Sequence, residues 1–167
     1  MKKLLMLALI LAPVCVFAQK FGHVDSSSII PLMPEYAQAQ TELETLSKQY
    51  QDELKYLQDE LTKKDNDYQA QAETLPDNIK QRRQEELQEL YQKIQQFYQD
   101  SDANLQKASR EKMADITNKV LKAIQAVGDE GSYICIFDSA DGVVPYISKT
   151  ATTDVTEQVK AKLGIKY

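Results

Sequence analysis

Few residues of this chain have the types and spacing that a metal site or a catalytic site requires. His23 is the only histidine, so a histidine cluster cannot bind a metal ion, and we expect it to pack in a strand or be exposed. Asp25 and Asp138 are single carboxylates near expected strand ends, and acid–base catalysis needs a second group nearby. Residues 26–28 are serines without a glycine elbow or a base. The sequence predicts turn or cap roles for both aspartates, no metal, no cofactor and no enzymatic activity.

The first 18 residues resemble a secretory signal peptide. Lys2 and Lys3 precede an apolar run over residues 4–12, and small and apolar residues lead to Ala18. The run is too short to remain in a bilayer as a spanning helix. We expect cleavage after Ala18, so that the mature protein leaves the cytosol. The alternative is a lipid attached to Cys15, but Val14 stands where such sites favour a small residue.

The charge of the mature chain limits its partners. Removing residues 1–18 deletes two of the 20 basic residues and none of the 25 acidic ones, which leaves 18 against 25 and a formal net charge of −7. Phosphate contacts need an excess of Lys and Arg, so nucleic acid is not an expected partner. Cys135 is then the only cysteine, and we expect it to be a small buried apolar residue. The alternative is mixed-disulfide chemistry in the envelope.

Two long helices are expected in the middle of the chain. Pro34 and Glu35 suit a helix start, and no glycine or proline follows before Pro76. The apolar positions of this first helix step by 3-4-4 residues, a period of 11 residues in three turns that is typical of a nearly straight coiled coil. They are Leu43, Leu46, Tyr50, Leu54, Leu57, Leu61, Tyr68 and Ala72, and the polar residue Asp65 occupies the one interrupted position between Leu61 and Tyr68.

The second helix should begin near Pro76, with Thr74 and Asp77 as a capping pair, and should run to about Val127, where Gly128 and Gly131 end it. Its apolar set is Ile79, Leu87, Leu90, Ile94, Tyr98, Leu105, Ala108, Ile116, Val120, Ile124 and Val127. A short break between two such helices predicts an antiparallel hairpin over residues 35–127 with its tip near residues 74–78. Opposite charges support this register, with Glu35, Glu42 and Glu44 beside Lys107, Arg110 and Lys112.

The remaining residues predict a small sheet. Residues 21–25 form a first strand, residues 133–137 a strand buried on both faces, and residues 143–147 a strand returning after a turn at residues 139–142. Residues 154–157 should cap a short helix with Val155, Val159 and Leu163 on its apolar face, stopped by Gly164. Three strands and one short helix make a weak isolated domain with open edges, so we expect several copies to close those edges against one another.

The order of these segments resembles the Skp (OmpH) family of periplasmic chaperones, in the form common in Bacteroidetes-like relatives. The resemblance covers nearly all of the mature chain and rests on residues 21–25, 33–36 with Ala39 and Leu43, 136–138, 142–146, 154–159 and 163–164. It implies an α+β fold, in which a long antiparallel helical hairpin, or coiled-coil arm, stands on a small β body that assembles as a trimer. The body would comprise residues 19–34 and 128–167.

The resemblance also implies a function. Members of the family hold unfolded outer-membrane proteins between their arms without ATP, in the periplasm and without stable insertion in the membrane. By resemblance the trimer body would include Phe21, Val24, Ile134, Ile136, Val144 and Tyr146. The best-studied members are strongly basic, which helps them attract acidic clients and lipopolysaccharide, whereas the acidic balance of this chain argues against a lipopolysaccharide site. The alternative function is that of a structural coiled-coil scaffold or spacer in the envelope.

A protein that holds unfolded chains needs dispersed apolar surface. Apolar residues beside the 3-4-4 positions are candidates for this surface, namely Tyr56, Tyr91, Phe97, Met113 and Leu121. Tyrosine suits the task because its ring supplies contact area and its hydroxyl tolerates water. The alternative is that these residues widen the apolar stripe inside the hairpin or pack where the arm meets the body.

Overall fold

A computed structural model describes residues 19–140, 142 and 144–165; the predicted signal peptide lies outside the described residues. The described residues divide into two units, one formed by those up to Ser26 together with those from Lys122 onward and the other by Ser27–Leu121. The elements in chain order are β1 (Phe21–Val24), α2 (Ser26–Ile29), the 3₁₀ turn η1 (Ile30–Leu32), α3 (Pro34–Gln71), α4 (Asp77–Gly131), β2 (Cys135–Asp138), β3 (Thr153–Asp154) and α5 (Thr156–Lys162).

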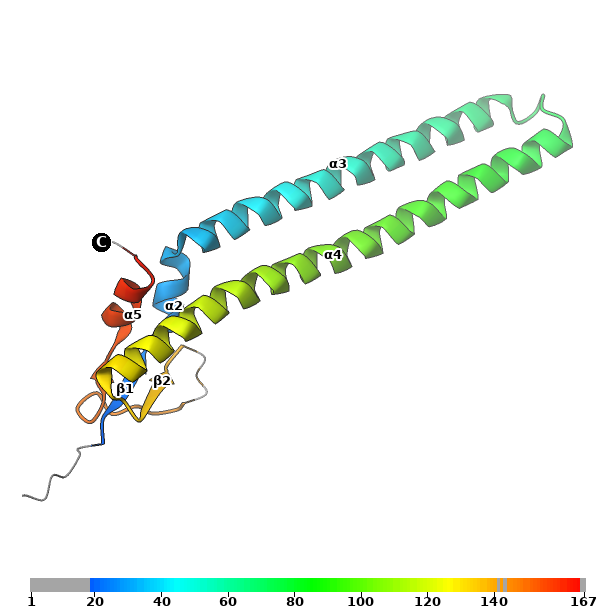
Figure 1. The fold of residues 1–167 in the computed structure, drawn as a ribbon. Coiled ribbons are helices and arrows are strands. Elements are labelled where there is room, and N and C mark those ends of the chain that lie inside the picture. Colours follow the sequence, from blue (N-terminus) through cyan, green and yellow to red (C-terminus); the bar gives the residue numbers. More distant parts are fainter. Residues whose placement is uncertain (1–18, 141, 143, 166–167) are drawn as a thin grey trace, which may run out of the picture. The chain divides into compact units, whose positions relative to one another are not determined.

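The predicted helical hairpin is confirmed. Helix α3 and the part of α4 before Lys122 run antiparallel and side by side (Figure 1). Pro34 occupies the start of α3, where its missing N–H costs no helical hydrogen bond, and Glu35 follows in the first turn. The sequence between Pro34 and Gln71 is rich in Gln, Glu, Lys, Leu and Ala, which are strong helix formers. The short elements α2 and η1 were not predicted.

The bend between the helices differs in detail from the expected capping pair. The Thr74 hydroxyl donates to the carbonyl oxygen of Gln71 at 3.0 Å, so it satisfies the end of α3 and does not cap α4. The carbonyl of Pro76 accepts the first hydrogen bonds of α4, from the N–H groups of Ile79 and Lys80 at 2.9 and 3.0 Å. Pro76 has no backbone N–H and could not donate the hydrogen bond that a continuous helix requires at its position, so the chain forms two helices here.

The apolar seam of the hairpin follows the 3-4-4 pattern. Leu57, Leu90, Ile116 and Val120 are buried, and the other predicted seam residues of α3 are half-buried. Tyr98 is the exception, because its side chain is 64% exposed. The predicted place of Tyr98 in the seam is wrong.

Ion pairs join the two helices near the base of the hairpin. Lys112 pairs with Glu42, as predicted, and Lys119 pairs with Glu35 at 2.7 Å. Lys107 instead lies 4.0 Å from Glu111 on its own helix, so its predicted role across the hairpin is wrong. The hydrogen bond from Lys119 lowers the pKa of Glu35, and the one from Lys112 lowers the pKa of Glu42. These exposed pairs set the register more than they stabilise the hairpin.

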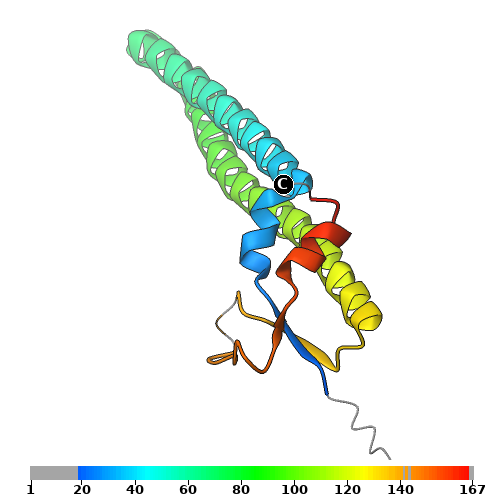
Figure 2. The same ribbon diagram turned by 90° about the vertical axis from the view of Figure 1, so that its left-hand side faces the viewer.

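The small sheet has three strands in the order β2-β1-β3, and both neighbours pair parallel to β1 (Figure 2). Phe21 lies opposite Cys135, and His23 lies opposite both Phe137 and Asp154. The predicted hairpin of residues 133–137 and 143–147 is therefore wrong. Residues 144–147 form no strand, and the third strand is β3. Residues 135–138 are half-buried, so β2 is not covered on both faces as predicted.

Helix α4 ends four residues later than predicted. The N–H of Tyr133 donates to the carbonyl of Gly128 at 3.0 Å and that of Ser132 to Asp129 at 3.3 Å, which is a Schellman arrangement. Ser132, with φ of 54°, takes the left-handed position that glycine usually holds. A Cβ on Gly131 would lie 2.3 Å from the Tyr133 ring, and this close approach explains the glycine there. Lys20 Nζ sits 3.9 Å from the centroid of the same ring.

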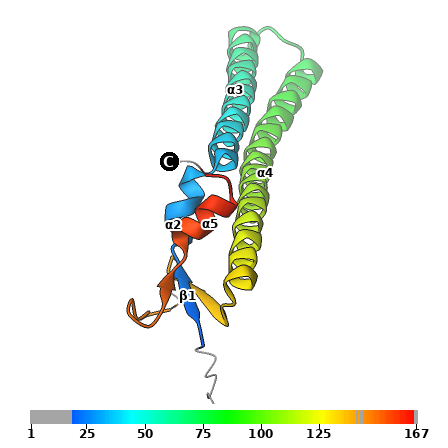
Figure 3. The same ribbon diagram turned by 60° about the vertical axis from the view of Figure 1, so that its left-hand side comes forward.

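The C-terminal helix forms as predicted. Asp154 Oδ1 accepts a hydrogen bond from the N–H of Thr156 at 2.9 Å, and Gly164, with φ of 72°, follows the helix end. Val155 and Val159 are fully buried, as is Val24 of β1, against which α5 packs (Figure 3). Across the part of the chain that the structure describes, no helix has the length and apolar character needed to cross a membrane.

Candidate functional site

The exposed apolar side chains of the hairpin form its candidate functional surface. Tyr56 on α3 and Tyr91 and Leu121 on α4 are exposed, whereas Phe97 and Met113 are half-buried. These residues are spread along the helices, with polar residues between them. Such scattered rings can contact a flexible chain at several points without forming one large adhesive patch.

Phe97 and Tyr98 lie the opposite way round from the prediction, which placed Tyr98 in the seam and Phe97 on the surface. Phe97 turns toward α3, where its ring meets that of Tyr50 edge to face with centroids 6.0 Å apart. Tyr98 is the more exposed ring. Tyr98 is therefore a candidate surface residue that periodicity alone missed, and Phe97 contributes to the seam as well as to the groove beside it.

That groove lies at mid-length of the hairpin. It has a volume of about 230 Å³ and is lined by Ser47, Tyr50, Gln51, Leu54, Phe97, Tyr98, Ser101, Asp102 and Leu105. Aromatic and leucine side chains make up much of its wall, and its polar groups are hydroxyls, an amide and one carboxylate. An open groove of this kind can accept an apolar or aromatic side chain.

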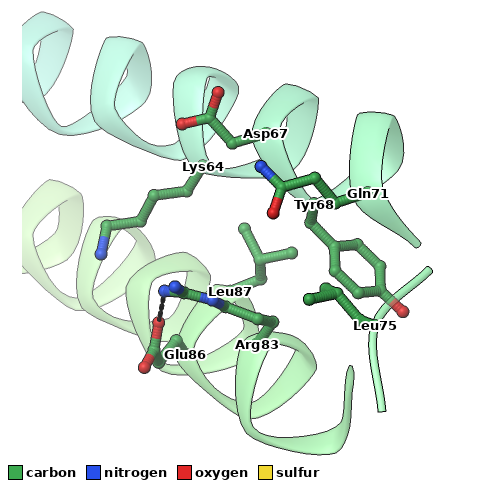
Figure 4. Close-up of a pocket in the computed structure, with 8 residues that line it drawn as sticks. All are labelled: Lys64, Asp67, Tyr68, Gln71, Leu75, Arg83, Glu86 and Leu87. Atoms are coloured by element: carbon green, nitrogen blue, oxygen red, sulfur yellow. Dashed lines mark hydrogen bonds and ion pairs between the residues drawn. The ribbon is translucent and has the colours of Figure 1, made fainter. Parts of the chain in front are cut away.

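A second, smaller pocket lies near the tip. Figure 4 shows its lining residues between the end of α3 and the start of α4. Its volume is about 150 Å³. Lys64 and Arg83 line it together with Asp67 and Glu86, so its formal charges cancel. Arg83 Nη1 lies 2.9 Å from Glu86 Oε2. The hydrogen bond from Arg82, and to a smaller extent the one from Arg83, lowers the pKa of Glu86. Lys64 Nζ lies 3.7 Å from Glu60 Oε1, so both basic groups of the lining are already paired and the pocket offers little attraction to an anion.

The residues predicted for a shared body divide into buried and exposed ones. Val24 is fully buried within its own unit, and Phe21, Ile136 and Val144 are half-buried. Ile134 and Tyr146 are 60% and 79% exposed. Phe21 of β1 stacks on Phe137 of β2 with ring centroids 6.4 Å apart, and both rings are half-buried. Ile134 directly precedes the edge strand β2, and exposed apolar side chains of this size are typical of surfaces that meet another chain.

The single histidine and Asp138 make hydrogen bonds that join segments of the small sheet unit. Thr152 Oγ1 donates to the carbonyl of Ser148 at 2.6 Å, so it accepts from His23 Nδ1, which lies 2.9 Å away. Asp138 Oδ1 accepts from the backbone N–H groups of Ser26 and Ala140 at 3.2 and 3.0 Å, which confirms its predicted turn role. The N–H of Asp25 donates to Thr156 Oγ1 at 3.1 Å. Cys135 is a free, half-buried thiol.

Comparison with known proteins supports the resemblance noted in the sequence. A solved structure from Caulobacter crescentus CB15, assigned as an OmpH-like outer-membrane chaperone, superposes with a TM-score of 0.72 at 16% identity. The similarity covers 87% of this chain and 83% of that one, and at this identity it shows a shared fold. No curated protein matches the chain. The sequence model of the outer membrane protein (OmpH-like) family matches residues 20–163. The chain therefore belongs to the OmpH-like family.

Proposed function

We propose that this protein is an ATP-independent holdase of the periplasm that binds unfolded outer-membrane proteins and prevents their aggregation. The observation that carries the proposal is the family match over residues 20–163. The OmpH-like structure from Caulobacter crescentus is assigned as an outer membrane chaperone, and the shared fold supports the same class of role here. We propose a binding protein that is not an enzyme.

The surface of the hairpin supports this function. Tyr56, Tyr91 and Tyr98 are all more than half exposed, and each offers a ring with a hydroxyl at its end. A single exposed ring binds an unfolded chain weakly, but several rings that act on one chain raise the overall affinity through effective concentration. Weak, dispersed contacts also suit a protein that must release its client.

We further propose that three copies assemble through the sheet and enclose the client between their arms. Both β2 and β3 are outer strands, because β1 lies between them, and each leaves one edge of the sheet unpaired within the described chain. Open edges favour pairing with another chain. Ile134 and Tyr146 supply exposed apolar side chains in the same unit. A client held by three arms would meet three copies of each tyrosine.

The test uses the chain from residue 19 to 167. Light scattering of the purified protein should give three times the mass of one chain, and a mixture with one urea-unfolded porin should give a larger, defined species. Dilution of the porin from urea should produce less aggregate in the presence of the protein, with or without ATP. Unchanged porin aggregation at a molar excess of the trimer would refute the holdase function.

The same measurements separate a structural scaffold or spacer of the envelope from a holdase. A scaffold requires one fixed partner and leaves porin aggregation unchanged, and its assembly can be a dimer. A monomer or dimer in light scattering would refute the proposed trimer even where aggregation is suppressed.

A further inference from the structure

The groove at mid-length of the hairpin arises from small residues in the apolar seam. Most seam positions of α4 carry Leu, Ile, Phe or Val, but between Phe97 and Leu105 the inward position is Ser101. Ser47 of α3 lines the same groove. Two serines fill far less volume than two leucines, so the helices leave space at this point of the seam.

The hydroxyl of Ser101 is the second unusual feature of the groove. Thr41, Thr45 and Thr62 each donate to the carbonyl four residues earlier, at 3.1, 2.8 and 2.9 Å, as hydroxyls in helices commonly do. Ser101 Oγ is closed to solvent and has no hydrogen-bond partner among the described residues. An unpaired buried hydroxyl lowers stability, and a partner that enters the groove would remove this cost once the serine side chain rotates toward it.

The size and chemistry of the groove define what it can hold. Its volume of about 230 Å³ exceeds the roughly 150 Å³ of an apolar cavity that accommodates benzene. The rings of Tyr50 and Phe97 and the side chains of Leu54 and Leu105 supply apolar walls. Asp102 is the only charged residue of the lining, so an acidic side chain is disfavoured.

We propose that this groove is a subsite for one phenolic side chain, a tyrosine of the bound unfolded polypeptide, whose hydroxyl pairs with Ser101 Oγ. The identity of this occupant rests on the proposed function. Membrane β-barrels carry girdles of aromatic residues, so their unfolded chains present many such side chains. Tyr98 is an exposed residue of the lining and is placed to cover the ring that enters.

The experiment uses p-cresol as the probe, with toluene as the analogue that lacks the hydroxyl. In two-dimensional NMR of the full mature protein, p-cresol should shift the methyl signals of Leu54 and Leu105 saturably. Ser101→Leu fills the groove and should weaken p-cresol binding at least about tenfold. Ser101→Ala keeps the space but removes the hydroxyl, and should reduce the preference for p-cresol over toluene about fivefold.

A leucine placed elsewhere on the helix is the matched control. Asn104 is exposed and does not line the groove, so Asn104→Leu adds the same side chain and should leave p-cresol binding unchanged. Ser101→Leu places an apolar residue in an apolar seam and should retain the fold. Absence of saturable shifts in the wild type, or equal binding by wild type and Ser101→Leu, would overturn the subsite.

The same variants separate the subsite from the holdase function. In the porin aggregation assay, Ser101→Leu should protect less well than Asn104→Leu. Equal protection by the two would overturn a client role for the groove and leave the holdase function standing. Failure of the wild type to protect any porin, with p-cresol still bound, would instead refute the holdase function and preserve the groove as a phenol site.

Discussion

The ring of Phe97 meets the ring of Tyr50 edge to face, with centroids 6.0 Å apart, and this contact joins α3 to α4 beside the mid-arm groove. The two residues are 47 positions apart in the chain, and the hairpin brings them together. Edge-to-face contacts between aromatic rings add about 0.5–1.5 kcal/mol beyond the burial of their surface. The neighbouring Tyr98 is mostly exposed. Phe97 and Tyr98 therefore allow the loss of a seam ring to be compared with the loss of an exposed ring within one helical turn.

Replacement of Phe97 should therefore destabilise the hairpin. We expect Phe97→Ala to lower the free energy of unfolding by about 2 kcal/mol, because it removes a half-buried ring and its contact with Tyr50. Tyr98→Ala should change it by less than about 0.5 kcal/mol. Urea unfolding followed by far-UV circular dichroism measures both. Equal effects of the two substitutions would contradict the placement of Phe97 in the seam.

The exposed tyrosines should matter for clients and not for folding. We expect Tyr56→Ser combined with Tyr91→Ser to reduce suppression of porin aggregation severalfold while the unfolding midpoint stays within experimental error, because both rings are exposed. A matched control replaces two exposed polar residues, Gln58 and Gln92, with serine. Full protection by the tyrosine variant would remove these residues from the client surface.

Acidification should weaken the base of the hairpin through Glu35 and Glu42. Hydrogen bonds from Lys119 and Lys112 hold their pKa values below the ordinary 4.5, so the folded state binds fewer protons than the unfolded state near that pH. The stabilisation is complete above about pH 5 and is lost as the pH falls through the folded pKa values. Glu35→Gln with Glu42→Gln should flatten the dependence of the unfolding midpoint on pH between about 5 and 3.

The control for this pH dependence uses other acids of α3. Glu44 and Glu53 are exposed and make no ion pair among the described residues, so their replacement by glutamine should leave the slope closer to that of the wild type. High salt should shrink the difference between the two double variants, because both pairs are open to solvent. A slope that is identical in the two variants would exclude Glu35 and Glu42 as its source.

Two glycines of α4 should respond in opposite directions to alanine. A Cβ on Gly131 would lie 2.3 Å from the Tyr133 ring, so Gly131→Ala must displace that ring from Lys20 and should cost about 1–2 kcal/mol. A Cβ on Gly128 would meet Ile136 at an ordinary 3.6 Å, and Gly128→Ala should stabilise by about 0.5–1 kcal/mol. Thermal unfolding compares them. The cost of Gly131→Ala should shrink in a Tyr133→Ala background, and an unchanged cost would contradict this steric explanation.

The helical hairpin was predictable because its signals are local and repeated. A 3-4-4 spacing sustained over 30 residues fixes which face of α3 is apolar, and Pro34 and Pro76 mark helix starts through their missing N–H groups. The orientation of a single residue within the helix is harder to predict from the spacing. Phe97 and Tyr98 are adjacent and both aromatic, and the position of Tyr50 across the hairpin decides which one turns inward.

The small sheet was the least predictable part. Residues 133–137 and 143–147 are both rich in β-forming residues and are separated by a turn sequence, which favours a local hairpin. In the structure the partner of β2 is β1, more than 100 residues earlier, and the pairing is parallel. A pattern of residues does not encode strand direction when the partner lies so far away in the chain.

By itself the sequence determined the two long helices, the break between them, the short C-terminal helix and the family, since each depends on residue types at regular spacing. Only the tertiary structure decided the parallel sheet, the inward turn of Phe97 and the groove at Ser101. These features depend on which side chains meet from distant parts of the chain and how much volume they fill together. Periodicity predicts which face of a helix is apolar, but packing partners from distant parts of the chain decide which of two adjacent residues turns inward.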